Sequence, residues 1–179
     1  MNGGRTRPAV FLDRDGTLIV DVGYPSNPDD VELVEGAAPA LTELRSEGFA
    51  LVVVSNQSGI ARGLVSPEQA AAVHERFVEE LRRRGATLDD VRYCPHAPDA
   101  GCDCRKPAPG MLITAAEDLG LDLSHSFAIG DKLSDVEAGR LVGCRTILFG
   151  QNGDRDVDAD HVSPDWPDAV AFIRSMSAS

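Results

Sequence analysis

The chain has 179 residues, of which 42% are hydrophobic and 26% charged, the composition of an ordinary globular protein. This length favours one α/β domain over residues 1–179, because two domains of half that size would each bury only a thin core. The net charge of −12 repels phosphate backbones and anionic lipids, and no run of about 20 apolar residues is present, so we expect neither a nucleic-acid nor a membrane partner.

The N-terminal segment, residues 1–16, has too few consecutive apolar residues for the hydrophobic region of a signal peptide. We therefore expect a cytoplasmic protein, and we expect it to act as a monomer.

The first half of the chain predicts a strand, a helix and a second strand, followed by a long helix. The apolar runs Ala9–Leu12 and Phe49–Val54 are typical of buried parallel strands. Between them Ala37–Glu47 has a helical composition and stops before a glycine, which suits a helix end. Ser66-Pro67-Glu68-Gln69 combines an N-cap, a first-turn proline and a capping-box glutamine, so it predicts a helix over 67–84.

The second half continues this alternation. The expected strands and helices are strands over 91–93, 126–129 and 145–149, and helices over 110–119, 133–142 and 165–176. A polar, acidic surface loop is expected over 151–160. Strands alternating with helices predict an α/β fold with a doubly wound, Rossmann-like parallel sheet, and the length leaves no room for a large cap domain.

Two carboxylates follow the first predicted strand in the string Asp13-x-Asp15-Gly16-Thr17. Ligand sites in parallel sheets collect at the carboxyl ends of strands, so we expect chemistry here rather than a simple acidic turn. One aspartate can attack phosphorus while the other gives and takes protons.

Three further motifs follow in chain order. Ser55, at the end of the second strand, offers a hydroxyl to phosphoryl oxygens. Lys106 and Lys132 are the only lysines among 17 basic residues, which hints that a compact ammonium is wanted at each position, as at a phosphate. Asp131, in Gly130-Asp131-Lys132-x-x-Asp135, adds a carboxylate beside Asp13, and hard oxygen ligands suit Mg²⁺.

With these four motifs in this order, the chain resembles the haloacid dehalogenase-like phosphatases over about residues 8–150. The resemblance implies that Asp13 is the nucleophile of an aspartyl-phosphate intermediate and Asp15 the general acid and base. It further implies that Ser55 and Lys106 hold the phosphoryl group. The implied Mg²⁺ ligands are Asp13, the Asp15 carbonyl and Asp131, with Asp135 placed behind them.

Three cysteines and a histidine lie within the expected loop of about residues 94–109, spaced as Cys94-x-His96-x5-Cys102-x-Cys104. This is the ligand set of a closed tetrahedral zinc site. A disulfide is the alternative, but it is disfavoured in a reducing compartment and would leave one thiol unexplained. Because four protein ligands leave no open position for water, the zinc is expected to pin the following residues in place. We expect structural roles for the other cysteine and histidines, namely Cys144, His74, His125 and His161.

A zinc loop within a phosphatase of this class resembles the D-glycero-D-manno-heptose 1,7-bisphosphate phosphatases and the related histidinol-phosphatase domains. The strings Asp21-x-Gly23-Tyr24 and Gln57-Ser58-Gly59-Ile60-Ala61-Arg62-Gly63 favour the heptose group. Arg105, next to Lys106, is expected to bind the non-reacting phosphate through its planar fork. The expected substrate-binding residues are Asp21, Gly23, Tyr24, Asn56, Gln57, Ser58, Arg105 and Lys132.

The resemblance carried by these motifs implies a Mg²⁺-dependent, zinc-stabilised phosphatase that removes the 7-phosphate from a heptose 1,7-bisphosphate, a small-molecule substrate. The nearest enzymatic alternative is a histidinol-phosphate phosphatase or another small sugar-phosphate phosphatase. Outside the enzymes, a phospho-accepting receiver module shares an acid pair, a hydroxyl, a lysine and Mg²⁺ on a parallel sheet, and a zinc-stabilised binding domain is a third alternative. Turnover separates the phosphatase from both of these.

Overall fold

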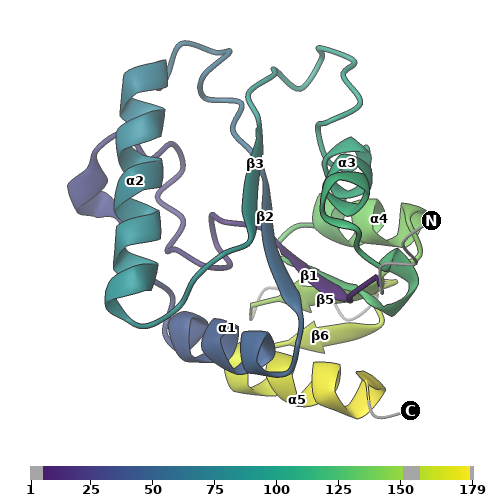
Figure 1. Cartoon of the computed structure of the whole chain (residues 1–179). Coiled ribbons are helices and arrows are strands. Elements are labelled where there is room, and N and C mark those ends of the chain that lie inside the picture. The colour runs from purple at the N-terminus through teal and green to yellow at the C-terminus, as the bar shows by residue number, and fades with distance from the viewer. Residues whose placement is uncertain (1–5, 151–157, 178–179) are drawn as a thin grey trace.

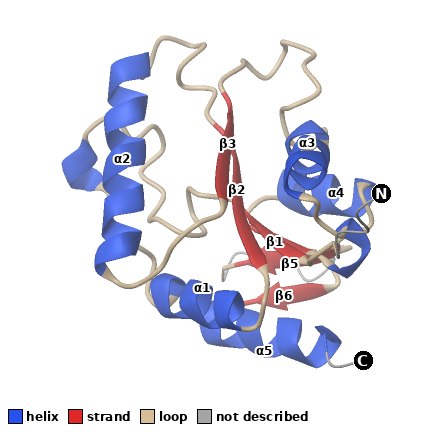
Figure 2. Cartoon of the chain, in the orientation of Figure 1, coloured by secondary structure: helices blue, strands red, loops and turns tan. Residues whose placement is uncertain are grey.

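The structure, a computed structural model, describes residues 6–150 and 158–177. Its sheet has six strands, all parallel, in the order β3-β2-β1-β4-β5-β6 (Figures 1 and 2). The strands are β1 (Ala9–Leu12), β2 (Ala50–Asn56), β3 (Asp90–Cys94), β4 (Phe127–Gly130), β5 (Arg145–Phe149) and β6 (His161–Ser163). The predicted doubly wound parallel α/β fold is therefore confirmed.

Helices cover both faces of this sheet. They are α1 (Ala37–Ser46), α2 (Pro67–Arg83), α3 (Gly110–Leu119), α4 (Leu133–Leu141) and α5 (Trp166–Ser177), with two 3₁₀ turns, η1 (Pro28–Asp30) and η2 (Leu123–His125). Helices α1, α2 and α5 lie on one face, and α3 and α4 lie on the other (Figure 1).

The side chains of β1 divide between two hydrophobic clusters, as alternation along a strand requires. Val10 and Leu12 join the cluster under α1, α2 and α5, whereas Ala9 and Phe11 join the cluster under α3 and α4. All four residues are buried. A strand buried on both faces has apolar residues without a polar alternation, which is the pattern visible in the sequence.

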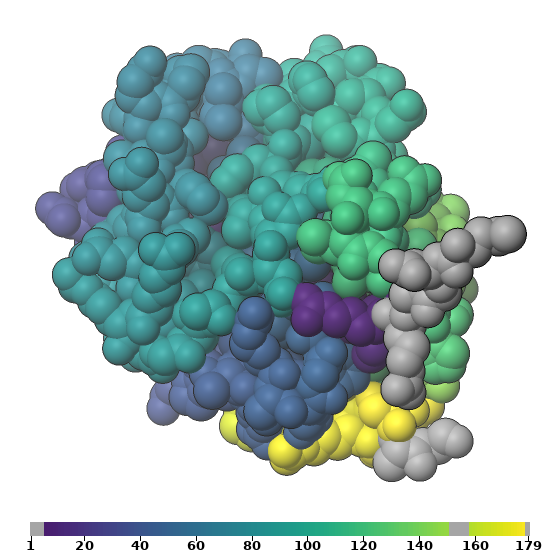
Figure 3. All heavy atoms as spheres, viewed as in Figure 1, coloured from purple at the N-terminus to yellow at the C-terminus, as the bar shows by residue number. Residues whose placement is uncertain are grey.

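The strand order reverses between β1 and β4, since β2 and β3 extend the sheet on one side and β5 and β6 on the other. In open parallel sheets a ligand crevice forms at such a switch point, beyond the carboxyl ends of the strands. Two loops lie beside this edge, residues 57–66 after β2 and residues 95–109 after β3. They form neighbouring lobes at the top of the molecule in Figure 3 and are joined by a hydrogen bond from the Ala61 amide to the Pro95 carbonyl.

The predicted elements agree with the structure to within about two residues at each end. The capping box at Ser66 and Gln69 is present, so the start of α2 is confirmed. Strand β6 was not predicted, because it is only three residues long and adjoins a polar stretch. Of the predicted loop over 151–160, residues 151–157 lie outside the described residues. No helix in the described ranges is long and apolar enough to span a membrane.

Candidate active site

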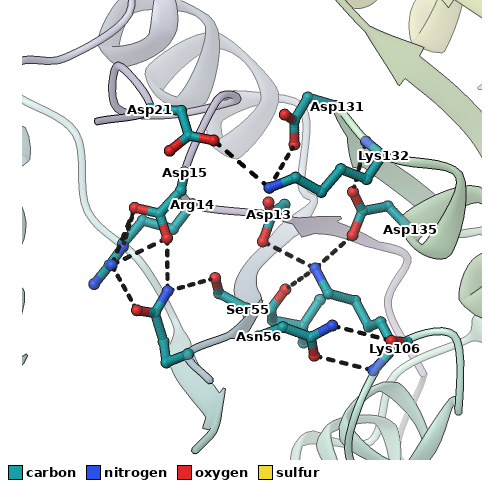
Figure 4. A network of polar contacts seen from close by, with 12 residues as sticks. Asp13, Arg14, Asp15, Asp21, Ser55, Asn56, Lys106, Asp131, Lys132 and Asp135 are labelled. Carbon is teal, nitrogen blue, oxygen red and sulfur yellow. Dashed lines mark hydrogen bonds and ion pairs between the residues drawn. The ribbon is translucent and has the colours of Figure 1, made fainter. Parts of the chain in front are cut away.

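Asp13, Lys106, Asp131 and Asp135 meet at the switch point, although they come from three separate segments of the chain (Figure 4). Asp13 follows β1, and its amide donates a hydrogen bond to the Ile129 carbonyl on β4, 2.9 Å away. Asp131 and Asp135 follow β4, and a carboxylate oxygen of each lies within 4.8 Å of one from Asp13. The sheet therefore converts strand ends that are distant in sequence into one cluster.

Lys106 is buried and its ammonium has three oxygen partners. Nζ lies 2.9 Å from Asp13 Oδ1, 2.6 Å from the Val54 carbonyl oxygen and 2.5 Å from Asp135 Oδ1. Burial by itself lowers the pKa of Lys106, but Asp13 and Asp135 outweigh it and raise that pKa. Burial likewise opposes the charge on Asp13, and Lys106 outweighs it, so the pKa of Asp13 is lowered.

Three carboxylates share this one buried lysine, so negative charge is in excess. Burial and the charges of Asp13 and Asp135 raise the pKa of Asp131 to about 7, although Lys132 opposes them. Asp131 Oδ1 is buried and accepts no hydrogen bond, and Lys132 Nζ is 3.9 Å away. A buried carboxylate oxygen without a hydrogen-bond donor can bind a metal ion, and Mg²⁺ prefers such hard oxygen ligands. The residues present therefore fit the predicted magnesium site.

Two glycines leave room for these acids. A Cβ at Gly16 would lie 2.4 Å from Asp131 Oδ2, and a Cβ at Gly130 would lie 2.1 Å from Asp135 Oδ2. Gly16 also has a φ of +84°, a conformation that favours glycine. Asp135 accepts a hydrogen bond from the Lys132 amide at the start of α4, and its ion pair with Lys106 brings it into the cluster. The sequence had placed Asp135 behind the metal ligands, so its closeness to Asp13 is a finding of the structure.

The carboxylate of Asp15 lies apart from the metal cluster, so its predicted contribution to Mg²⁺ rests on the carbonyl. Its Oδ2 accepts hydrogen bonds from Arg14 Nη2 at 3.0 Å and from Gln57 Nε2 at 2.6 Å. Burial and the charge of Asp13 raise the pKa of Asp15, although Arg14 and Gln57 act to lower it. A raised pKa suits a carboxyl group that has to deliver a proton near neutral pH.

Ser55 and Asn56, both predicted site residues, lie at the carboxyl end of β2 (Figure 4). Ser55 is buried, and its hydroxyl accepts a hydrogen bond from Gln57 Nε2 at 3.0 Å. The Asn56 side chain is paired with the backbone of Lys106, donating to its carbonyl and accepting from its amide, both at 3.0 Å. In this structure Asn56 positions the Lys106 segment, a pairing that no pattern in the sequence indicates.

Four other predicted substrate-binding residues, Lys132, Asp21, Gly23 and Tyr24, have contacts of their own. Lys132 Nζ is 3.7 Å from Asp21 Oδ2, and Asp21 Oδ1 accepts a hydrogen bond from the Gly23 amide. Exposed Tyr24 contacts Arg62 through its hydroxyl, and Arg62 also stacks over its ring.

Arg105 and Ser58, also predicted to bind substrate, are both partly buried. Arg105 is partly buried, and its Nη1 is buried without a hydrogen-bond partner, which suits an anion ligand. Ser58 is partly buried at the start of the loop after β2, where its carbonyl accepts from the Arg62 amide.

The four predicted zinc ligands come together in the loop after β3. Their ligand atoms lie 3.2–3.6 Å apart in the five contacts among Cys94, His96, Cys102 and Cys104. A tetrahedral zinc with bonds of ~2.3 Å to sulfur has ligand atoms about 3.7 Å apart, so this cluster is close to that size. All four cysteines are free thiols, which is against the disulfide alternative.

The remaining histidines and cysteine lie outside this cluster. Cys144 is buried in the core under α4, as predicted. His125 pairs with Asp122, and His161 pairs with Asp168 at 2.6 Å. His74 contacts the Tyr93 hydroxyl, which also contacts Arg14.

Comparison with known proteins identifies relatives over most of the chain. A family model described as HAD-hydrolase-like matches residues 103–172. The D-glycero-beta-D-manno-heptose-1,7-bisphosphate 7-phosphatase of Photorhabdus laumondii is 47% identical over 153 residues, 82% of this chain and 81% of the relative. The Escherichia coli protein of the same name is 42% identical over 166 residues, 89% of this chain and 87% of its own.

A solved structure has the same fold over almost the whole chain. The D,D-heptose 1,7-bisphosphate phosphatase from B. bronchiseptica, crystallised with magnesium and phosphate, superposes with a TM-score of 0.85 at 30% identity. The similarity covers 95% of this chain and 99% of that one.

Proposed function

The chain belongs to the D-glycero-beta-D-manno-heptose-1,7-bisphosphate 7-phosphatases of the haloacid dehalogenase-like superfamily, and on this basis we propose how its own residues perform that reaction. The enzyme hydrolyses the 7-phosphate of the bisphosphate and releases the heptose 1-phosphate. It is a Mg²⁺-dependent phosphatase, like its relatives. The supporting observation is the contact of 2.9 Å between Lys106 Nζ and Asp13 Oδ1 at the sheet's switch point.

In the first step Asp13 acts as the nucleophile. Its carboxylate oxygen bonds to phosphorus while the bond between phosphorus and the C7 oxygen breaks. Asp15 gives its proton to that leaving oxygen, for which its raised pKa suits it. Lys106 and Ser55 hold the phosphoryl oxygens, and Lys106 holds Asp13 in its charged form.

In the second step Asp15, now a carboxylate, takes a proton from water. The water oxygen bonds to phosphorus, the bond to the Asp13 oxygen breaks, and inorganic phosphate leaves with both aspartates restored. Mg²⁺, when bound by Asp13, Asp131 and the Asp15 carbonyl, supplies positive charge that offsets the repulsion between phosphate and carboxylates. A carboxylate oxygen of Asp135 lies within 4.8 Å of those of Asp13 and Asp131, close enough to help orient these two proposed Mg²⁺ ligands.

The second phosphate requires its own positive charge, because Lys106 is committed to the reacting group. Arg105 provides it in this proposal, with its unpaired buried Nη1 available. Zinc, held by Cys94, His96, Cys102 and Cys104, fixes the loop from which Arg105 and Lys106 project. In this proposal the sugar is surrounded by the other predicted substrate-binding residues, namely Asp21, Gly23, Tyr24, Gln57, Ser58 and Lys132. Asn56 acts indirectly, by holding the Lys106 backbone.

The test is a steady-state comparison of four substrates with purified protein and Mg²⁺. These are the two heptose 1,7-bisphosphate anomers, histidinol phosphate and fructose 1,6-bisphosphate, with products identified by phosphorus NMR. We expect kcat/KM to be highest for the beta anomer, with loss of the 7-phosphate only, and Asp13→Asn to release no phosphate. Higher kcat/KM for histidinol phosphate would assign the chain to that reaction, and uptake of one phosphate without turnover would indicate a receiver module.

A further inference from the structure

Arg14 lies between the two catalytic aspartates in sequence and is buried, with a relative exposure of 2%. An arginine is rarely buried unless its charge is paired. Its partner is Asp15: Nε lies 3.2 Å and Nη2 3.0 Å from Oδ1, and Nη2 is also 3.0 Å from Oδ2. One guanidinium therefore contacts both oxygens of the neighbouring carboxylate.

Gln57 closes this arrangement from the opposite side. Its Oε1 accepts a hydrogen bond from Arg14 Nη2 at 3.0 Å, and its Nε2 donates to Asp15 Oδ2 at 2.6 Å. The three side chains form a closed triangle of charge-assisted hydrogen bonds, of which Arg14 and Asp15 are labelled on the left of Figure 4. Rotation of the Asp15 carboxyl would break bonds to two partners at once.

Arg14 is also held in place by Tyr93 of β3, the strand at one edge of the sheet. Its guanidinium lies 5.3 Å from the ring centroid of Tyr93 on β3, and Nη1 is 3.5 Å from the Tyr93 hydroxyl. His74 of α2 lies 2.9 Å from the same hydroxyl through Nδ1. Each of the three guanidinium nitrogens thus has a protein partner, and the closest contacts of Arg14 are with Asp15 and Gln57.

We propose that Arg14 is a positioning residue that, together with Gln57, fixes the Asp15 carboxyl in the orientation needed for proton transfer to the leaving oxygen and from water. This inference rests on the proposed function, because Asp15 is the acid and base of that reaction. The side-chain partners of Arg14 are Asp15, Gln57 and Tyr93, and neither Asp13 nor Asp131 is among them. Its effect is exerted through Asp15 alone.

A test can separate proton transfer from phosphate binding by changing the leaving group. An alkyl phosphate needs a proton from Asp15, whereas the nitrophenolate of p-nitrophenyl phosphate leaves without one. Hence kcat/KM for the alkyl substrate reports the acid role. The aryl substrate needs no acid in the first step, but it forms the same aspartyl-phosphate, which water must then hydrolyse. For this substrate a fall in kcat therefore reports the base role of Asp15 in the second step.

We expect Arg14→Met to lower kcat/KM for heptose 1,7-bisphosphate by about a hundredfold, the usual effect of a misplaced proton donor. For p-nitrophenyl phosphate kcat/KM should fall about tenfold or less, and kcat should fall more than kcat/KM. Arg14→Lys keeps the charge but cannot bond both oxygens, so its losses should lie between wild type and Arg14→Met.

The matched control is Arg92→Met on β3, which also removes an arginine paired with carboxylates, those of Asp90 and Asp118. Its ratio of alkyl to aryl kcat/KM should equal that of wild type. Thermal unfolding of every variant shows whether it is folded. If Arg14→Met is unfolded, the comparison of alkyl and aryl kcat/KM is made with Arg14→Lys instead.

Equal losses of kcat/KM for both substrates, or no loss in a folded Arg14→Met, would overturn the positioning role of Arg14. The assignment of the chain as a phosphatase would still stand. If wild type hydrolyses p-nitrophenyl phosphate and fructose 1,6-bisphosphate but not the heptose substrate, the assigned substrate fails. The Arg14 comparison then proceeds on fructose 1,6-bisphosphate. A wild-type enzyme that turns over none of them would overturn both proposals.

Discussion

Lys106 illustrates how a single side chain is adapted to its place in the site. Its relative exposure is 4%, and removing an ammonium from water costs several kcal/mol unless good partners replace the water. Asp13, Asp135 and the Val54 carbonyl supply those partners. Lys106 is therefore charged before substrate arrives, and the field that a phosphate meets is already in place.

Arg105 differs from Lys106 because one of its nitrogens is buried without a partner. We predict that Arg105→Ala lowers kcat/KM for heptose 1,7-bisphosphate about ten- to a hundredfold, which corresponds to roughly 1.5–3 kcal/mol for a lost charge-assisted contact. The loss for p-nitrophenyl phosphate should be much smaller, because that substrate has no second phosphate. Steady-state kinetics on both substrates measures the difference. Equal losses would place Arg105 at the reacting phosphate instead.

At the scale of elements, the loop between β3 and α3 is notable for how little apolar packing holds it. Cys94 is buried at the end of β3, while His96 and Asp103 are exposed. The Gly110 amide donates to the Asp103 carbonyl at 2.9 Å, which joins the loop to the start of α3. Apart from Cys102 and Cys104, which pack against the core cluster under α3 and α4, the loop has few apolar contacts, and we expect its order to depend on bound zinc.

We predict that Cys102→Ser lowers the zinc content of the purified protein and lowers the Tm by about 5–10 °C, as expected for a loss of roughly 2–3 kcal/mol. Activity should fall with it, because Arg105 and Lys106 follow the last ligand directly. Metal analysis and thermal unfolding measure the two effects, and Cys144→Ser, outside the cluster, is the control for zinc content. Wild-type protein that holds no zinc when prepared without chelator would rule out the site.

Asp89 connects three elements at the opposite end of the sheet. Its carboxylate accepts from the Leu51 amide of β2 and Arg45 of α1, both at 2.9 Å, and it pairs with Arg7 before β1. Burial raises the pKa of Asp89, but these donors outweigh it and hold that pKa below its ordinary value of 3.8. The charged form is therefore more stable in the folded chain than in the unfolded chain.

We predict that Asp89→Asn lowers the free energy of unfolding by about 1–2 kcal/mol at pH 7. Since the folded pKa is depressed, the wild-type advantage exists above the unfolded pKa and is lost as the pH falls through the folded pKa. Urea unfolding of both proteins from pH 7 to pH 3 should show the two values converging below about pH 4. A difference independent of pH would exclude the charge as its cause.

At the scale of the whole molecule, Trp166 ties the C-terminal helix to the loop after β1. It is fully buried, and its Nε1 donates to the Thr17 carbonyl at 3.1 Å. Its ring also packs on Phe149 of β5, with centroids 5.0 Å apart. The last helix thus supports the loop in which Asp13 and Asp15 lie, from a position almost 150 residues away in sequence.

We predict that Trp166→Phe lowers the free energy of unfolding by roughly 1–3 kcal/mol, because a buried carbonyl loses its donor while the aromatic ring is kept. Urea unfolding should show a lower midpoint with an unchanged m-value, since the surface exposed on unfolding is nearly the same. An unchanged midpoint would mean that water replaces the lost donor.

Several features followed from the sequence because they depend on neighbours in the chain. The start of α2 was predictable from Ser66 and Gln69, since a capping box satisfies amides within one turn. The proximity of the four expected zinc ligands was predictable from their spacing, since all four lie within eleven residues of the chain. Strand β6 was not predictable because it has only three residues, and the pairing of Asn56 with Lys106 was not predictable because the two residues are 50 positions apart in the chain.

By itself the sequence determined the parallel α/β fold, the acid pair at Asp13 and Asp15, and the phosphatase family, because apolar runs and motif strings are local patterns. Only the tertiary structure decided that Asp135 joins Asp13 and Asp131, and that the guanidinium of Arg14 pairs with the Asp15 carboxylate. These arrangements depend on which strands are neighbours and on how burial forces each charge to find a partner. Both conditions exist only once the strands are assembled and water is excluded.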